Sequence, residues 1–141
     1  MGWSRMRMDN EEGGSSVRLL IADDHALVRS GLRSLLKREP DFEIAGEAED
    51  GREAVELCRG LRPDLVLMDM RMPRMDGLEA TRAIKREHPK TRVLMVTMHD
   101  DQDYILEAIK AGAAGYVLKD APREELIAAV RRVMDGRPPR F

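Results

Sequence analysis

The chain has 141 residues, enough for one domain with a sizeable core. Its 24 basic and 26 acidic residues give a net charge of −2, so no overall field favours nucleic acid or a membrane surface as partner. No apolar run approaches the ~20 residues of a membrane-spanning helix, no signal-peptide core is present, and a single cysteine excludes an internal disulfide. We therefore expect a cytoplasmic protein that does not contact membranes.

The first strands and the first helix follow a polar leader. Residues 1–16 are polar, rich in glycine and without periodicity, and we expect them to be disordered. A strand is predicted over Val17–Ala22, just before a pair of aspartates. Apolar residues at helical spacing then predict a helix that stops before Pro40. Phe42–Glu47 alternates apolar and polar residues, which favours a strand near the sheet edge.

The middle of the chain repeats the pattern of helix and strand. Asp50 and Glu53 resemble a capping box at the start of a helix that we expect to end at Gly60. The stretch Leu65–Asp69 has four apolar residues in a row and ends in a carboxylate. It predicts a strand buried on both faces, followed by a loop over residues 73–77.

The second half of the chain supplies the remaining elements. Asp76 is expected to cap a helix, and strands are predicted over Val93–Thr97 and Gly115–Lys119. Apolar stripes that end at Gly112 and Gly136 predict two further helices. Five strands alternating with five helices predict an α/β fold, in which a doubly wound parallel sheet carries helices on both faces.

Polar and charged side chains stand at four of the predicted strand ends, namely Asp23-Asp24, Asp69, Thr97 and Lys119. Because the carboxyl ends of parallel strands share one edge of the sheet, we expect these residues to converge. Three carboxylates brought together need a cation, and oxygen ligands suit Mg²⁺. A lysine and a hydroxyl can contact phosphoryl oxygens. The set predicts phosphoryl transfer to Asp69, which would give an acyl phosphate.

Four ordered motifs also carry a family resemblance: Asp-Asp after the first strand, Val-Leu-Met-Asp-Met-Arg-Met-Pro-Arg-Met-Asp-Gly, Thr after the fourth strand, and Gly-Tyr-Val-Leu-Lys. Over residues 17–136 the chain resembles the receiver domain of bacterial two-component response regulators. The sequences Asp-Asp-His and Gly-Tyr-Val-Leu-Lys-Asp-Ala-Pro are similar to those of NarL/FixJ-like, LuxR-type regulators. The resemblance implies a flavodoxin-like (βα)5 fold with strand order 2-1-3-4-5.

The resemblance further implies a metal site and a phosphorylation site. Asp69 matches the phosphoacceptor and also a metal ligand. Asp24 matches the direct acidic ligand, whereas Asp23 matches the carboxylate that holds the ion through water. The backbone carbonyl of Arg71 matches the group that completes the site. The implied ion is Mg²⁺, with Mn²⁺ as the alternative.

A switch and a set of partners are implied in the same way. Thr97 matches the switch hydroxyl, Tyr116 the switch aromatic and Lys119 the phosphate-pairing lysine. Phosphorylation would draw Thr97 inward, let Tyr116 follow, and remodel the face of the fourth helix, fifth strand and fifth helix. A sensor histidine kinase is the implied phosphoryl donor, and a phosphorylation-linked homodimer the implied product.

The resemblance implies a transcription regulator rather than a turnover enzyme. Self-phosphorylation from small donors and slow autodephosphorylation are the most that it would catalyse. DNA would be bound only through a C-terminal helix-turn-helix domain that is absent here, and residues 137–141 read as the start of a linker to it. A stand-alone receiver is the alternative.

Some positions depart from the family pattern and leave alternatives open. Lys119 precedes Asp120 rather than proline, so the isomer of that peptide bond is open. Arg71 and His99 occupy positions that modulate acyl-phosphate lifetime, in a direction that we leave open. A phosphohydrolase of the haloacid-dehalogenase kind would need a second aspartate where Arg71 stands. A degenerate receiver that acts only as an interaction module is a further alternative. Such a receiver would lack some of the acidic residues or the lysine, whereas this sequence has all of them.

Other residues near the site have structural interpretations. His25 and His99 are expected to be exposed loop residues rather than metal ligands. Cys58 is expected to be a small core residue. Six methionines near the site are expected to fill the core, namely Met68, Met70, Met72, Met75, Met95 and Met98.

Overall fold

The computed structural model describes residues 16–98 and 102–138, so all but the last residue of the expected leader lies outside the described part. Strands and helices alternate in chain order. They are β1 (Val17–Ala22), α1 (Ala26–Leu36), β2 (Phe42–Ala48), α2 (Gly51–Leu61), β3 (Leu65–Asp69), α3 (Gly77–Glu87), β4 (Arg92–Thr97), α4 (Gln102–Ala111), β5 (Gly115–Leu118) and α5 (Arg123–Met134). The predicted order of elements is confirmed.

The five strands form one parallel sheet in the order β2-β1-β3-β4-β5, as predicted. β3 lies at the centre and is buried along its whole length, whereas β2 is an edge strand. Its register against β1 shifts between Leu19 and Leu20, so Ala45 is an extra residue in β2. Because all strands are parallel, their carboxyl ends lie along one edge of the sheet.

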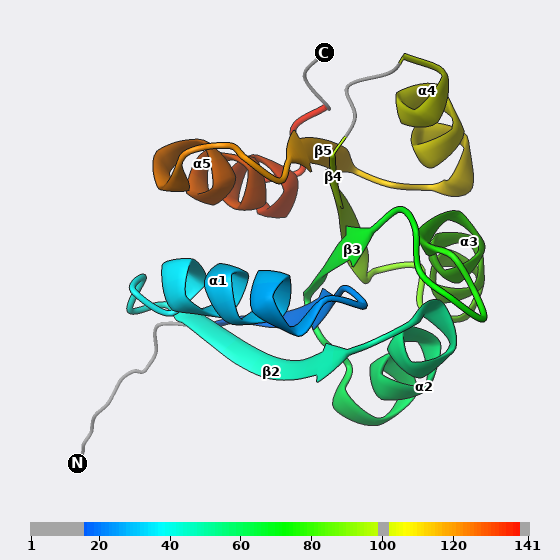
Figure 1. Cartoon of the computed structure of the whole chain (residues 1–141), viewed down its shortest axis with the longest axis horizontal. Coiled ribbons are helices and arrows are strands. Elements are labelled where there is room, and N and C mark those ends of the chain that lie inside the picture. The colour runs from blue at the N-terminus through cyan, green and yellow to red at the C-terminus, as the bar shows by residue number, and fades with distance from the viewer. Residues whose placement is uncertain (1–15, 99–101, 139–141) are drawn as a thin grey trace.

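Helices cover both faces of the sheet, with α1 and α5 on one side and α2, α3 and α4 on the other (Figure 1). Each face has its own apolar core. On the first, Leu36 of α1 and Val130 of α5 are buried against Leu67 of β3. On the second, Ala54 of α2 and Ile84 of α3 are buried with the side chains of β3 and β4 that point the other way.

The predicted caps of α2 and α3 differ in detail. At α2, the Glu53 N–H donates to Asp50 Oδ1 over 2.8 Å, but the Glu53 carboxylate accepts from the N–H of Glu49 over 2.7 Å. The reciprocal half of the capping box is thus displaced by one residue. At α3, Asp76 and Glu79 form the complete capping box, which confirms the cap predicted at Asp76.

The prediction that Gly60 ends α2 was wrong. The helix continues to Leu61 and stops where Arg62 adopts the left-handed conformation, with φ of 49°. The Arg62 N–H donates to the Cys58 carbonyl and closes the last turn over 3.0 Å. Gly60 is tolerated within the helix because its face is open, with nothing within 4 Å of a Cβ.

The methionines near the site divide into core and surface residues. Four are buried, namely Met68, Met70, Met72 and Met95, and Met75 packs against the core. Met98 is 70% exposed, so its predicted core role was wrong: it lies just beyond the end of β4. Cys58 is buried as expected, and burial, assisted by the charge of Glu87, raises the pKa of its thiol to about 12. Among the described helices, none is long and apolar enough to cross a membrane.

Candidate functional site

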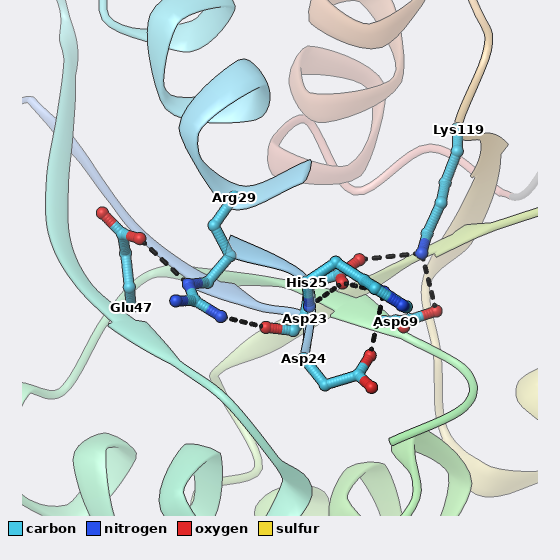
Figure 2. A network of polar contacts seen from close by, with 7 residues as sticks. All are labelled: Asp23, Asp24, His25, Arg29, Glu47, Asp69 and Lys119. Atoms are coloured by element: carbon cyan, nitrogen blue, oxygen red, sulfur yellow. Dashed lines mark hydrogen bonds and ion pairs between the residues drawn. The ribbon is translucent and has the colours of Figure 1, made fainter. Parts of the chain in front are cut away.

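The carboxyl edge of the sheet brings together three carboxylates and one lysine (Figure 2). Asp23 and Asp24 directly follow β1, Asp69 is the last residue of β3, and Lys119 directly follows β5. The structure thus places these four residues side by side although 96 positions separate the first from the last (119 − 23). The strand was expected to include Lys119, but β5 ends at Leu118, so Lys119 lies just outside it.

Lys119 bridges the two buried carboxylates. Its Nζ lies 2.8 Å from Asp23 Oδ2 and 3.3 Å from Asp69 Oδ1. Asp23 and Asp69 are 1% and 5% exposed, so neither carboxylate is well solvated by bulk water. The peptide bond between Lys119 and Asp120 is trans, like all those in the described part of the chain. A buried ion pair of this kind fixes the lysine tip between β1 and β3.

The turn between β1 and α1 presents the first two aspartates. The Asp23 N–H donates to the Ala48 carbonyl of β2 over 3.0 Å. Asp23 Oδ1 accepts from the His25 N–H over 2.8 Å, so this carboxylate also holds the start of α1. The Asp24 side chain is 30% exposed and therefore faces the open side of the site. One aspartate is consequently fixed inside the protein while the next can meet a ligand.

The loop after β3 passes very close to Asp69. The Gly77 N–H donates to the Met70 carbonyl over 2.9 Å, and a Cβ on Gly77 would stand 2.1 Å from the Asp69 carbonyl oxygen. Within the loop, Arg74 has a φ of 66° and its Nε lies 2.6 Å from a carboxylate oxygen of Asp50. The loop is thus tied to α3 at one end and to the cap of α2 in its middle.

Replacing Gly77 by alanine is expected to lower the free energy of unfolding by about 1–3 kcal/mol, because the atom that a Cβ meets is backbone and cannot move aside. Urea unfolding followed by circular dichroism measures this change. Gly60→Ala is the matched control, since its Cβ meets nothing and alanine favours the helix by about 0.5–1 kcal/mol. Equal effects of the two substitutions would contradict the close approach of the loop to β3.

The site shifts the pKa values of its central pair. Burial raises the pKa of Asp69, the charge of Asp23 raises it further, and Lys119 and the Arg71 backbone N–H partly offset both. For Lys119, burial lowers the pKa, but the contacts with Asp23 and Asp69 outweigh burial and leave the pKa above its ordinary value. Lys119 is therefore a permanent cation, whereas the ionised form of Asp69 is held at a cost in stability.

The donor set fits a hard divalent cation. Asp23, Asp24, His25 and Asp69 each offer a ligand atom, all within 4.8 Å of one another. Three carboxylates outweigh the charge of one lysine, so the site has excess negative charge. Mg²⁺ prefers a few carboxylate oxygens together with water and phosphate oxygens. His25 is 67% exposed, as expected, but its Nδ1 lies 3.3 Å from Asp23 and 3.2 Å from Asp24. Imidazole suits zinc and copper better than magnesium, so the carboxylates form the fitting set.

The two residues expected to form the switch lie on neighbouring strands. Thr97 is the last residue of β4 and is 2% exposed. Tyr116 lies opposite Met95 in β5, is half-buried, and packs against the core on the side of α2, α3 and α4. Thr97 thus ends its strand at the edge that carries Asp69, and Tyr116 lies on the adjoining strand. His99 lies outside the described residues.

Arg71 makes a contact that the sequence does not reveal. Its backbone N–H is directed at the Asp69 carboxylate, while its guanidinium donates to the Tyr104 hydroxyl and lies 5.0 Å from the centre of the Tyr104 ring. The loop after β3 and helix α4 are therefore in contact through these two side chains. No sequence spacing signals this pair, which is 33 positions apart.

Comparison with known proteins identifies the family. The model of the response regulator receiver domain matches residues 19–131. The chain belongs to the response regulator receiver domain family. The predicted resemblance is thereby confirmed, including its LuxR-type character: the receiver matches a crystal structure of a LuxR-family two-component response regulator from Aurantimonas sp. SI85-9A1. That match has a TM-score of 0.85 and 40% identity, and covers 89% of this chain and 90% of the other.

Two further relatives differ in how much of their own length the receiver matches. It is 40% identical to the transcriptional regulatory protein DegU of Brevibacillus brevis, over 92% of this chain and 55% of DegU. It also matches a structure of the CheX-CheY-BeF3-Mg complex from Borrelia burgdorferi, with a TM-score of 0.83, 27% identity, and coverage of 89% and 94%. The chain spans little more than half the length of the curated relatives that it matches.

Proposed function

We propose that this receiver accepts a phosphoryl group on Asp69 in a reaction that needs Mg²⁺, and that the modification changes the activity of a transcription regulator. The observation that carries the proposal is the buried bridge of Lys119 between Asp23 and Asp69, with Asp24 beside it at the open side. A carboxylate nucleophile, a fixed ammonium group and a carboxylate metal site are the parts that phosphoryl transfer to a protein side chain requires.

Each residue has a definite task in this proposal. An oxygen of the Asp69 carboxylate attacks phosphorus as the bond to the donor nitrogen or oxygen breaks. A nitrogen leaving group takes a proton from solvent, whereas acetate from acetyl phosphate leaves as the anion. Lys119 turns its ammonium group to a phosphoryl oxygen. Asp24, Asp69 and the Arg71 backbone carbonyl would hold the metal ion, and Asp23 would support it through water. When bound, the ion neutralises charge on the phosphoryl oxygens.

We further propose the output that the family resemblance implies. The hydroxyl of Thr97 would bond to a phosphoryl oxygen on Asp69, and Tyr116 on the adjacent strand would move with it. The two rearrangements would alter the face formed by α4, β5 and α5 and favour a homodimer. A sensor histidine kinase is the proposed donor. Because DegU is a transcriptional regulatory protein and is longer than this chain, we propose a C-terminal DNA-binding domain as the output, joined through a linker that begins at residue 137.

Intact-mass measurement after incubation with phosphoramidate or acetyl phosphate tests the proposal. We expect the chain to gain about 80 Da, one phosphoryl group, in Mg²⁺ but not in EDTA. The Borrelia burgdorferi relative was solved as a complex with BeF3 and Mg. No gain in Mg²⁺ would contradict the proposal. Continuous phosphate release without an adduct would instead support the phosphohydrolase alternative.

A further inference from the structure

Arg29 of α1 contacts the site from the side opposite to Lys119 (Figure 2). Its Nη1 donates to the backbone carbonyl of Asp23 over 2.6 Å, and its Nε donates to Glu47 Oε1 over 3.1 Å. The Arg29 side chain is only 14% exposed, and that of Glu47 is 26% exposed. A buried guanidinium with two partners in fixed directions has little freedom to move.

The Asp23 carbonyl lies in the turn that joins β1 to α1 and accepts from Arg29. It precedes α1, whose first hydrogen bond runs from the Arg29 N–H to the His25 carbonyl over 3.1 Å. The Asp23 N–H donates to the Ala48 carbonyl of β2 over 3.0 Å. Among the described residues, Arg29 is the side chain that donates to the Asp23 carbonyl, and it does so from α1.

Glu47 fixes the direction of Arg29 and also binds a second arginine. Arg33, one turn further along α1, donates from Nη1 to Glu47 Oε2 over 2.8 Å and is 48% exposed. Among the contacts of the described residues, Arg33 shares Glu47 with Arg29 but does not reach Asp23. The chain thus contains two arginines with the same acidic partner, of which one touches the turn that carries the aspartates.

We propose that Arg29 is a positioning residue for the divalent cation: it orients the turn that bears Asp23 and Asp24. This inference rests on the proposed function and concerns the same site. A positioning role and a simple charge effect predict opposite changes in the Mg²⁺ affinity of Arg29→Gln. Removing a nearby positive charge would strengthen binding of a cation by Coulomb attraction alone, whereas loosening the turn weakens it. Loss of a hydrogen-bonding partner just outside a metal site lowers metal affinity by about 10–100-fold.

The experiment is a calorimetric titration of the full chain with Mg²⁺ for the native protein, Arg29→Gln, Arg29→Lys and Arg33→Gln, with the unfolding temperature of each recorded in EDTA. Arg29→Gln should raise the Mg²⁺ dissociation constant about tenfold or more. Arg29→Lys keeps the charge but loses the planar guanidinium that places two donating nitrogens in fixed directions, and it should recover part of the affinity. Arg33→Gln should change the dissociation constant by no more than about twofold, because it removes only an exposed ion pair.

The outcomes separate this inference from the proposed function. Native-like or tighter Mg²⁺ binding by Arg29→Gln would overturn the role of Arg29 alone, as would equal losses in Arg29→Gln and Arg33→Gln. Absence of Mg²⁺ binding by the native chain would overturn both. If Arg29→Gln fails to fold, Arg29→Lys decides: weaker binding than native supports the positioning role, and equal binding overturns it.

Discussion

Replacing Lys119 with methionine is expected to lower the free energy of unfolding of the receiver by about 3–5 kcal/mol in EDTA. Methionine matches the length of the lysine stem but removes the ammonium group that lies 2.8 Å from Asp23 and 3.3 Å from Asp69. Two carboxylates that are almost fully buried would then face each other without a cation. Urea unfolding of the native chain and Lys119→Met, followed by circular dichroism, measures the loss.

Magnesium distinguishes the electrostatic cause from simple loss of packing. Mg²⁺ should restore more stability to Lys119→Met than it adds to the native chain, because the bound ion supplies the missing positive charge. Lys110→Met is the control, since Lys110 is 73% exposed on α4 and its loss should change stability by less than about 0.5 kcal/mol. A Lys119→Met variant as stable in EDTA as the native chain would contradict the buried bridge.

Substituting asparagine for Asp69 should abolish phosphoryl uptake while raising stability by roughly 1 kcal/mol. Uptake is lost because the amide oxygen is a poor nucleophile and cannot form an acyl phosphate. Stability rises because burial and the charge of Asp23 disfavour the ionised carboxyl group in the folded state. Intact mass after treatment with phosphoramidate and Mg²⁺ measures uptake, and thermal unfolding in EDTA measures stability.

The pH dependence of this gain follows from the direction of the pKa shift. The pKa of Asp69 is raised in the folded state, so the folded chain binds this proton more tightly than the unfolded chain. The free energy of unfolding of the native chain therefore rises relative to that of Asp69→Asn as the pH falls through the pKa that Asp69 has in the folded state. Below the pKa that Asp69 has in the unfolded chain, the difference between the two proteins no longer changes with pH. The stability advantage of Asp69→Asn should shrink on acidification. Asp135→Asn, at an exposed ion pair beyond α5, should change neither uptake nor this pH dependence.

The sequence alone was sufficient for the architecture because each element is marked locally. The continuous apolar run Leu65–Met68, which ends in the Asp69 carboxylate, identifies a central strand, and regular alternation with helices leaves a parallel sheet as the simplest fold. From a parallel sheet it follows that Asp23, Asp69 and Lys119 meet at one edge. The same local reasoning failed at Gly60, because a glycine in a helix whose face is open is compatible with continuation.

The tertiary structure decided which side chains support the site. The sequence presents Arg29 as an ordinary charged residue of a helix, yet its side chain is held by Glu47 of β2, 18 positions away, as well as by the nearby Asp23 carbonyl. The contact of Arg71 with Tyr104 likewise depends on where α4 lies against the loop after β3. The periodicity and motifs of a sequence predict the conformation of a segment and the face that it buries. The direction of a long polar side chain is determined by partners from distant segments, and these are placed only when the sheet and its helices pack together.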